Sequence, residues 1–320
     1  MHLREATPTD HAAIVGLLKC SLGETMLPKS LDLWQWKHVD NPFGASPVLV
    51  AEEQDDIVGV RAFMQWGFSQ SGQFIKAIRA VDTAVHPDYQ GKGIFRKLTH
   101  TLTQACRQEE YQFIFNTPNS KSMPGYLKMG WQKRGNLPIK MAVVRPFGWF
   151  SGRKSGESKE NIQQDWPASL LAKVSSAEID GLQTCISPEF IQWRYVQNPL
   201  FRYGWFSDGE SYLCIFRIKP HQRFQELRIC ELLPLGNARK FDAKDFSKQL
   251  RQQVSAYRVP VITFSGESPV YFRSFGAYRF FSVSKGPMVT LRNLGLEDQQ
   301  FDELFAPQGL AFSLGDLELF

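Results

Sequence analysis

Residues 48 to 85 hold three runs rich in Val, Ile and aromatic side chains, separated by the polar turns EQDD and SQSG. Runs of this kind, bounded by turn residues, are typical of β-strands. We therefore predict three successive strands, the first beginning at Val48, the second from Ile57 to Trp66 and the third from Ile75 to Val85.

The segments on either side of these strands follow a helical period. Apolar side chains in residues 14 to 18 have helical spacing behind Asp10, which can cap the start of a helix. Residues 94 to 106 repeat this spacing. Further elements are expected at the N-terminus (a short strand) and in residues 111–115 (a strand), 120–131 (a short helix) and 138–144 (a strand). The first half is thus predicted to have the order β-α-β-β-β-α-β-α-β.

Residues 146 to 167 break this pattern, because they are polar and rich in Gly, Ser and charge. Such a composition is typical of a linker. We therefore predict a first domain of residues 1–148, a linker of residues 149–166 and a second domain of residues 167–320.

The second half repeats the first. WQWKHVDNP (34–42) recurs as IQWRYVQNP (191–199), and the later order of elements agrees. Strands are expected in 211–219, 225–235 and 259–266, a helix in 241–257, and 268–280 echoes 120–134. We infer an internal duplication, with two copies of one fold.

The repeated segment has a structural and a functional interpretation. Trp36 and Trp193 are expected to pack in the core, with a substrate wall as the alternative, while the Asn turns the chain and the Pro ends a helix. Trp34 and Phe43 are expected to be exposed aromatics that permit a sugar or an aromatic amine as ligand.

Charge and cysteine content narrow the class of protein. The 320 residues carry a net charge of +5, mostly scattered, which suits a polyanionic small ligand and lacks the dense stripe of a nucleic-acid-binding surface. The five cysteines form no C-x-x-C pair, so we expect buried free thiols in a reducing cytoplasm. No apolar run approaches the ~20 residues of a membrane span, and the charged N-terminus does not resemble a signal peptide. We expect a cytoplasmic protein with no metal, no nucleic-acid partner and no membrane partner.

The stretch HPDYQGKGIFRK (86–97) is the strongest candidate for binding chemistry. Gly91 and Gly93 let the backbone come close to a ligand oxygen, at the start of a helix whose first N–H groups are unpaired. Lys92 and Arg96 add positive charge. The pattern is neither a P-loop nor a dinucleotide fingerprint, and the second copy has no adjacent glycines here. Phosphate binding is therefore predicted for the first half.

The stretch AVDTAVHPDYQGKGIFRKLTHTL (80–102) resembles the acetyl-CoA signature of the GNAT superfamily of N-acetyltransferases, V-x-P-x-x-[QR]-x-x-G-x-[GA]. Val85, Pro87, Gln90 and Gly93 occupy this motif, whereas Phe95 stands at its last small position. A bulky residue in that position resembles the Eis-like tandem branch. NTPNSKSMPGYLKMGW (116–131) resembles a second family element, with Asn119, Ser122, Tyr126, Gly130 and Trp131 in its fixed positions.

The resemblance implies an α/β (α+β) fold of two tandem GNAT-like domains, each a mixed, mostly antiparallel twisted sheet flanked by helices, with a degenerate second copy. It also implies acetyl-CoA, or another acyl-CoA, as co-substrate. The pantetheine arm would enter where the strand before the loop and the strand after its helix splay apart. The implied cofactor-binding residues are Asp82, Thr83, Ala84, Val85, Gln90, Gly91, Lys92, Gly93, Ile94, Phe95, Arg96, Asn119 and Ser122.

The resemblance further implies direct attack by an amine, with a backbone N–H stabilising the oxyanion. Tyr126 would protonate the departing thiolate, the alternative being a packed helix tyrosine. In the Eis-like branch the C-terminal carboxylate can reach the active site, so Phe320 is the second implied catalytic residue. Asn119 would bind the cofactor arm or cap a helix. The general base stays open between Glu24, Asp32, Asp82, His86 and a water chain.

We expect an N-acetyltransferase that moves acetyl from acetyl-CoA to a primary amine of a small molecule, amino sugar or peptide. Two alternatives stay open: a non-catalytic acyl-CoA-binding module, and an aminoacyl-tRNA-dependent cell-wall peptide transferase of duplicated GNAT-like fold. The sequence does not identify the acceptor, and it leaves a homodimer open.

Overall fold

The contacts of the chain divide it into two compact units, whose segments alternate along the sequence. Unit 1 consists of Met1–Phe68, Gln73–Gly135 and Met288–Glu303, and unit 2 of Ser69–Gly72, Asn136–Pro287 and Leu304–Phe320. The computed structural model describes residues 1–23, 28–145, 165–175, 179, 181–236, 241–267, 278–284, 286–307 and 309–317.

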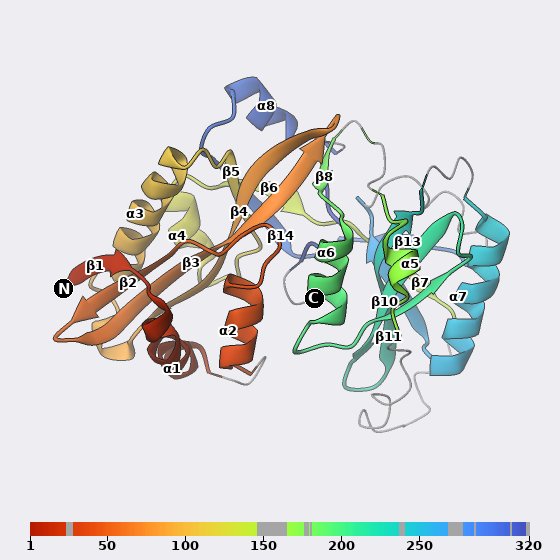
Figure 1. The fold of residues 1–320 in the computed structure, drawn as a ribbon, viewed down its shortest axis with the longest axis horizontal. Coiled ribbons are helices and arrows are strands. Elements are labelled where there is room, and N and C mark those ends of the chain that lie inside the picture. Colours follow the sequence, from red (N-terminus) through yellow and green to blue (C-terminus); the bar gives the residue numbers. More distant parts are fainter. Residues whose placement is uncertain are drawn as a thin grey trace. The chain divides into compact units, whose positions relative to one another are not determined.

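Unit 1 is built on a mixed sheet (Figure 1). The strand order is β1 (His2–Glu5), β2 (Val48–Glu53), β3 (Asp56–Gln70), β4 (Gln73–Val85), β5 (Phe113–Asn116), β14 (Met288–Asn293) and β6 (Gln132–Asn136). Its helices are α1 (His11–Leu22), α2 (Leu31–His38), α3 (Ile94–Gln108), α4 (Met123–Lys128) and α8 (Asp298–Glu303). β4 and β5 are parallel, whereas β1 with β2, β2 with β3, and β5 with β14 are antiparallel.

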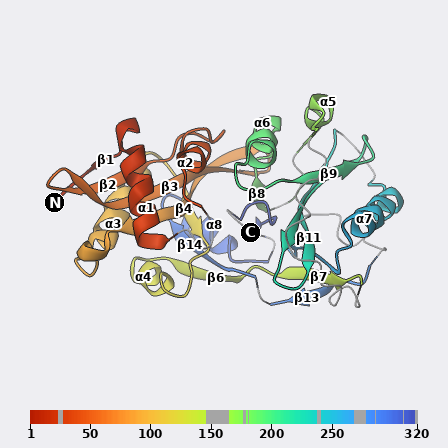
Figure 2. The same cartoon turned by 90° about the horizontal axis from the view of Figure 1, so that it is seen from below.

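Alternate residues of this sheet face opposite layers of helices. Leu49 of β2 lies in a core cluster with Leu98 of α3, while its neighbour Val50 lies in a cluster with Ile14 of α1 and Trp34 of α2. Successive strand side chains point to opposite faces. Helices α1 and α2 therefore cover one face and α3 and α4 the other (Figure 2).

Unit 2 has a second mixed sheet, with α7 (Ala243–Tyr257) packed against it. The strand order is β13 (Phe281–Val283), β7 (Ile139–Val143), β12 (Val261–Ser265), β11 (Gln225–Pro234), β10 (Tyr212–Pro220) and β9 (Gly204–Ser207). The shorter elements are α5 (Ala168–Leu171), β8 (Leu182–Thr184), α6 (Pro188–Ile191) with a π-helical turn (Gln192–Val196), and β15 (Leu310–Ala311), which pairs with β8. The predicted fold class, two mixed and mostly antiparallel sheets flanked by helices, is confirmed.

Each of the two sheets contains a parallel ladder of the same kind. Residues 77–79 of β4 pair with 113–115 of β5, and residues 226–228 of β11 pair with 261–263 of β12. In each case a 15-residue helix lies between the two strands in sequence. This shared arrangement supports the inferred duplication, although residues 268–277 of the predicted echo lie outside the described residues.

The predicted domain limits, 1–148, 149–166 and 167–320, stay a prediction. The contacts interleave the units instead, because β14 joins the sheet of unit 1 and β7 joins that of unit 2. Most of the predicted linker, residues 149–164, lies outside the described residues.

Two expectations about exposure are wrong. Trp34 is buried, because α2 turns it into the core cluster with α1, and its ring lies tilted against that of His38, with the ring centres 4.0 Å apart. Of the five free cysteines, Cys20 is exposed rather than buried. Trp36 and Trp193 are buried, as the structural interpretation predicted. Within the described ranges, no helix is long and apolar enough to cross a bilayer.

Candidate functional site

The parallel ladder between β4 and β5 ends early. Its last pair is Arg79 with Phe115, whereas β4 continues to Val85. Beyond Arg79, the backbone of β4 has no β5 partner, so its N–H and C=O groups on that side can pair with the amide groups of an extended ligand. Four predicted cofactor-binding residues lie in this unpaired part, namely Asp82, Thr83, Ala84 and Val85.

The end of β4 is fixed to the elements around it. The Val85 carbonyl accepts hydrogen bonds from Ser21 Oγ (3.0 Å) and Gln90 Nε2 (3.2 Å), and His86 N donates to the Val58 carbonyl (2.9 Å). Both lone pairs of the Val85 carbonyl are therefore used within the protein. Gln90, a predicted cofactor-binding residue, braces the loop through its side chain.

The glycine loop has the backbone that phosphate binding requires. Gly91 and Gly93 have φ values of +78° and +77°, and a Cβ at either position would meet nothing within 4 Å. The glycines are thus needed for their left-handed conformation. Gly93 is the N-cap of α3, and its carbonyl accepts a hydrogen bond from Lys97 N (3.0 Å). The next three N–H groups, up to Arg96, have no partner inside the helix and carry its positive dipole end.

Close packing fixes where α3 begins. Ile94 is buried, and a Cβ added to Gly59 of β3 would lie 2.9 Å from Ile94 Cγ2. The first turn of α3 can therefore approach the sheet only because residue 59 has no side chain. Gly91, Lys92, Gly93 and Arg96 remain exposed, as a binding loop must be.

The second motif places Tyr126 against the start of α3. Tyr126 is 4% exposed, and its ring meets Phe95 at 5.8 Å and Trp131 at 5.1 Å, both edge to face. Asn119 Oδ1 accepts hydrogen bonds from Lys121 N (3.0 Å) and Ser122 N (2.9 Å). Asn119 thus closes the turn before α4, whose N-cap is Ser122 rather than Asn119, and contact with the cofactor arm stays a prediction.

Arg61 of β3, which sequence reasoning missed, completes this cluster. It is fully buried, and its Nη1 donates a hydrogen bond to Tyr126 Oη at 2.9 Å. Its guanidinium carbon lies 4.6 Å from the Phe63 ring centre and 5.8 Å from that of Phe95. A charged residue at a core position of the strand DIVGVRAFMQWGF was the signal that could have revealed it.

A second polar cluster surrounds Asp82. Its Oδ2 accepts hydrogen bonds from Lys37 Nζ (2.6 Å) and His38 Nε2 (2.9 Å), and His38 Nδ1 pairs with Ser46 Oγ (2.9 Å). Burial opposes the charge of Asp82, but Lys37 and His38 together hold its pKa well below its ordinary value. A carboxyl held so firmly ionised is a weak general base.

The tautomer of His38 follows from its partners. Burial lowers the pKa of His38, and the ionised Asp82 can only accept, so Nε2 carries the proton and Nδ1 accepts from Ser46. Burial also lowers the pKa of Lys37. Lys37 and His38 belong to the repeated segment, whose recurrence was the available signal.

The other candidate bases contribute less. Asp32 is exposed in the first turn of α2, and His86 Nδ1 accepts a hydrogen bond from Asp88 N (3.4 Å), as a turn residue does. Glu24 and the implied catalytic residue Phe320 lie outside the described residues.

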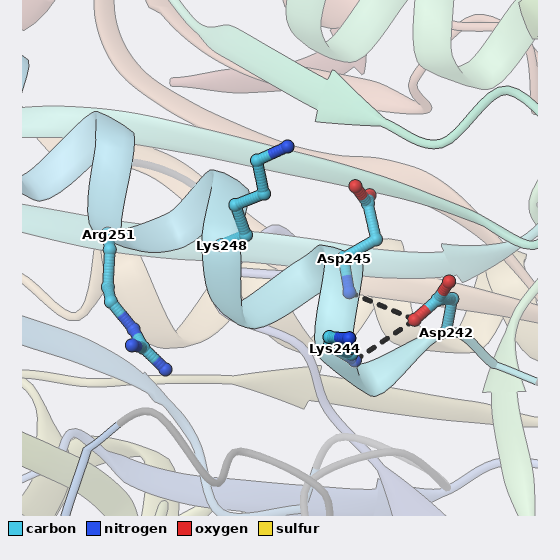
Figure 3. A pocket seen from close by; sticks show the side chains of 5 residues that line it. All are labelled: Asp242, Lys244, Asp245, Lys248 and Arg251. Atoms are coloured by element: carbon cyan, nitrogen blue, oxygen red, sulfur yellow. Dashed lines mark hydrogen bonds between the residues drawn. The ribbon is translucent and has the colours of Figure 1, made fainter.

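The second copy closes the corresponding helix start. Asp242 Oδ1 accepts hydrogen bonds from Lys244 N (3.0 Å) and Asp245 N (2.9 Å) at the beginning of α7. Figure 3 shows these bonds at the edge of a surface hollow of about 560 Å³, which Lys248 and Arg251 also line. A carboxylate already occupies the N–H groups that α3 leaves open, so this end of α7 is unsuited to an anion.

The C-terminal segment fills the second copy beside β11. Glu231 accepts hydrogen bonds from Tyr195 Oη and Ser313 Oγ, both at 2.6 Å. A Cβ at Gly315 would collide with Tyr195 and Glu231. Arg194 holds the same segment through the Gly315 carbonyl (3.0 Å). The C-terminal segment of the chain therefore occupies the space beside Glu231 in unit 2.

Comparison with known proteins agrees with this geometry. A family model described as an acetyltransferase (GNAT) domain matches residues 2–134. No curated protein matches the chain. Three solved structures share the fold over most of the chain.

A GCN5-related N-acetyltransferase from Anabaena variabilis is 13% identical, with a TM-score of 0.60 over 92% of this chain and 73% of that one. A conserved protein of unknown function from Enterococcus faecalis, described as a probable N-acyltransferase, is 11% identical, with a TM-score of 0.62 and the same coverage. Eis1 from Mycobacterium abscessus is 10% identical, with a TM-score of 0.57 over 94% of this chain and 76% of that one.

Proposed function

We propose that the chain is an N-acyltransferase that moves acetyl from acetyl-CoA to a primary amine, and the GNAT acetyltransferase family model that matches residues 2–134 supports this. One observation carries the proposal. The open, glycine-flanked start of α3 follows directly on the strand whose parallel ladder stops at Arg79. The start of α3 would suit the phosphate end of an acyl-CoA. The unpaired part of β4 would suit its amide-bearing arm.

Binding would use two kinds of donor. The N–H groups after Gly93 would hold the pyrophosphate, with Lys92 and Arg96 supplying charge that a dianion needs. The unpaired part of β4 would hydrogen-bond to the amides of the pantetheine arm. The Val85 carbonyl is already filled, so the bonds to the arm fall on the residues before it.

The chemical step would need little from the protein besides positioning. The amine nitrogen attacks the thioester carbonyl carbon, and a backbone N–H of residues 82–85 stabilises the oxyanion. The carbon–sulfur bond then breaks, the sulfur takes the phenol proton of Tyr126, and the new amide nitrogen loses a proton to water. The products are an N-acyl amine and free CoA.

The acceptor is proposed as a small molecule, an amino sugar or a peptide with a primary amine. Asp82 would face it as a fixed negative charge, which Lys37 and His38 hold in place through hydrogen bonds to Oδ2. Deprotonation of the acceptor ammonium is then left to water, because the Asp82 carboxylate is a weak base.

Calorimetric titration of acetyl-CoA into wild type, Gly93→Glu and Gly93→Ala tests the proposal. Gly93→Glu puts a carboxylate where the pyrophosphate should lie, while Gly93→Ala controls for backbone strain at φ +77°. Gly72→Glu, at φ +78° in the turn after β3, controls for the added charge elsewhere.

We expect wild type and Gly72→Glu to bind with micromolar affinity, about −8 kcal/mol, and Gly93→Glu not to bind. An acceptor screen that measures release of free CoA then follows. Failure of wild type to bind acetyl-CoA and longer acyl-CoAs would reject the proposal and favour the RNA-dependent alternative.

A further inference from the structure

The guanidinium of Arg61 is buried without a counter-ion. Its Nε and Nη2 are buried and have no hydrogen-bond partner among the described residues. Its neighbours are the rings of Phe63, Phe95 and Tyr126, with which it makes cation–π contacts at 4.6, 5.8 and 5.3 Å. A guanidinium stays protonated in proteins, so this is a permanent buried positive charge.

Such a charge is costly in the resting protein. Ring contacts offset part of the lost hydration, but buried cations are ordinarily paired with a carboxylate and fully hydrogen-bonded. Packing alone does not explain why residue 61 is an arginine, because an apolar side chain of similar length would fill the same space without the cost of burying a charge. We therefore expect this positive charge to stabilise a neighbouring group that acquires a negative charge.

Arg61 Nη1 reaches two acceptors, Tyr126 Oη at 2.9 Å and the Val81 carbonyl at 3.5 Å, and the bond to Tyr126 is the shorter. The guanidinium only donates, so Tyr126 Oη accepts the 2.9 Å bond from Nη1, and the phenol proton must point elsewhere. A tyrosine held in this way has its proton free for a third group. If the proton leaves, the phenolate oxygen that remains already faces a positive charge.

We propose that Arg61 is the positioning residue for Tyr126 in acyl transfer: it aims the phenol proton at the leaving sulfur and stabilises the phenolate formed. This inference rests on the proposed function. When the carbon–sulfur bond of the thioester breaks, the electron pair stays on sulfur, the proton passes from Tyr126 Oη to sulfur, and the phenolate lies beside the guanidinium. Water reprotonates Tyr126 for the next turnover.

The test is a double-mutant cycle of Arg61→Met and Tyr126→Phe, with kcat and acetyl-CoA affinity measured for all four proteins. Arg61→Met keeps the side-chain length and loses the donor and charge. We expect it to lower kcat about ten- to a hundredfold while acetyl-CoA affinity stays within about twofold. In the Tyr126→Phe background it should change kcat by less than about threefold, because the phenol oxygen on which it acts is gone. The same loss in both backgrounds would overturn the proposal.

Two variants separate charge from packing. Arg61→Lys keeps the positive charge and should retain more activity than Arg61→Met, and equal loss in both would overturn the charge argument. Arg107→Met is a control for the same substitution at an exposed arginine, whose Nε donates to the Leu294 carbonyl (2.8 Å) at the far end of α3. Its kcat should remain close to that of wild type, and a fall matching that of Arg61→Met would count against the proposal.

Two further measurements do not require transferase activity. They therefore distinguish failure of this inference about Arg61 from failure of the proposed function. The guanidinium NMR signals of Arg61 should be resolved in wild type and change in Tyr126→Phe. Arg61→Met should melt no lower than wild type, since it removes an unpaired buried charge. A signal indifferent to Tyr126, or a melting temperature lower by more than about 5 °C, would overturn the inference even in a protein without transferase activity.

Discussion

Asp82 and Glu231 occupy the same place in two different sheets. Each lies three residues after the last arginine of a parallel ladder, Arg79 in β4 and Arg228 in β11. Asp82 is bonded to His38 and Glu231 to Tyr195, which stand at the same position of the repeated W-[KR] segment. Both copies have thus kept a carboxyl group and its ring partner at the point where the ladder ends, half-buried at Asp82 and buried at Glu231.

Removing the carboxylate in unit 1 should destabilise the protein. Asp82→Asn leaves Lys37 buried without its counter-ion, so we expect the free energy of unfolding to fall by about 3–5 kcal/mol at pH 7. The loss should shrink near pH 10, because an unpaired buried Lys37 can release its proton. Urea denaturation at both pH values checks this. Asp88→Asn, at a side chain that is 83% exposed, is the control, and an equal effect of the two variants would contradict the expectation.

Glu231 should make the free energy of unfolding fall as the pH rises. Burial and then the negative charge of Asp316 raise the pKa of Glu231 from 4.5 to about 8. The unfolded chain releases this proton first, so the contribution is complete below pH 4.5 and is lost as pH rises through about 8. At about 1.4 kcal/mol per pKa unit, wild type should lose about 4 kcal/mol relative to Glu231→Gln between pH 5 and 9. Denaturation curves that stay parallel for the two proteins would refute this.

A methyl group at residue 59 of β3 should displace the start of α3 and with it the binding loop. Gly59→Ala brings a Cβ to 2.9 Å from Ile94 Cγ2, so the first turn of α3 must shift. We expect a loss of about 1–3 kcal/mol in stability and weaker acetyl-CoA binding. Calorimetry and thermal melts measure the two effects. Ile94→Ala should cost less stability in the Gly59→Ala background than in wild type, and strict additivity would argue against this contact.

The helix start of the second copy should matter for stability alone. Asp242→Ala removes the cap of Lys244 N and Asp245 N, so we expect a loss of about 1 kcal/mol. Acetyl-CoA affinity should not change, because α7 lacks the open glycine loop that precedes α3. A titration in which this variant weakens binding would place phosphate recognition in unit 2 and overturn the assignment to unit 1.

The local elements could be read from the sequence because their signals are local. The Val- and Ile-rich runs gave β2, β3 and β4, and the apolar face from Ile94 to Cys106 gave α3. Gly91 and Gly93 were singled out for a conformation that they do adopt. Tyr126 lies against Phe95, the residue at the last position of the loop motif.

The remaining features depend on contacts between distant parts of the chain. Nothing near residue 288 indicates that β14 pairs with β5, because strand pairing carries no local signal. Arg61 and Tyr126 are 65 positions apart, and the partner of a buried charge is visible only after folding. Trp34 was expected at the surface because the inward turn of α2 depends on its packing against α1.

The place of β14 in the first sheet bears on how the protein is made. A ribosome releases the chain from its N-terminus, yet β5 obtains its second neighbour only when residues 288–293 have emerged. Until then β5, with Phe113 and Phe115, is an unprotected edge strand of the kind that promotes aggregation. A nascent chain, or one shortened by a premature stop codon before residue 288, should therefore depend on chaperones even though residues 2–134, which the family model matches, have already been synthesised.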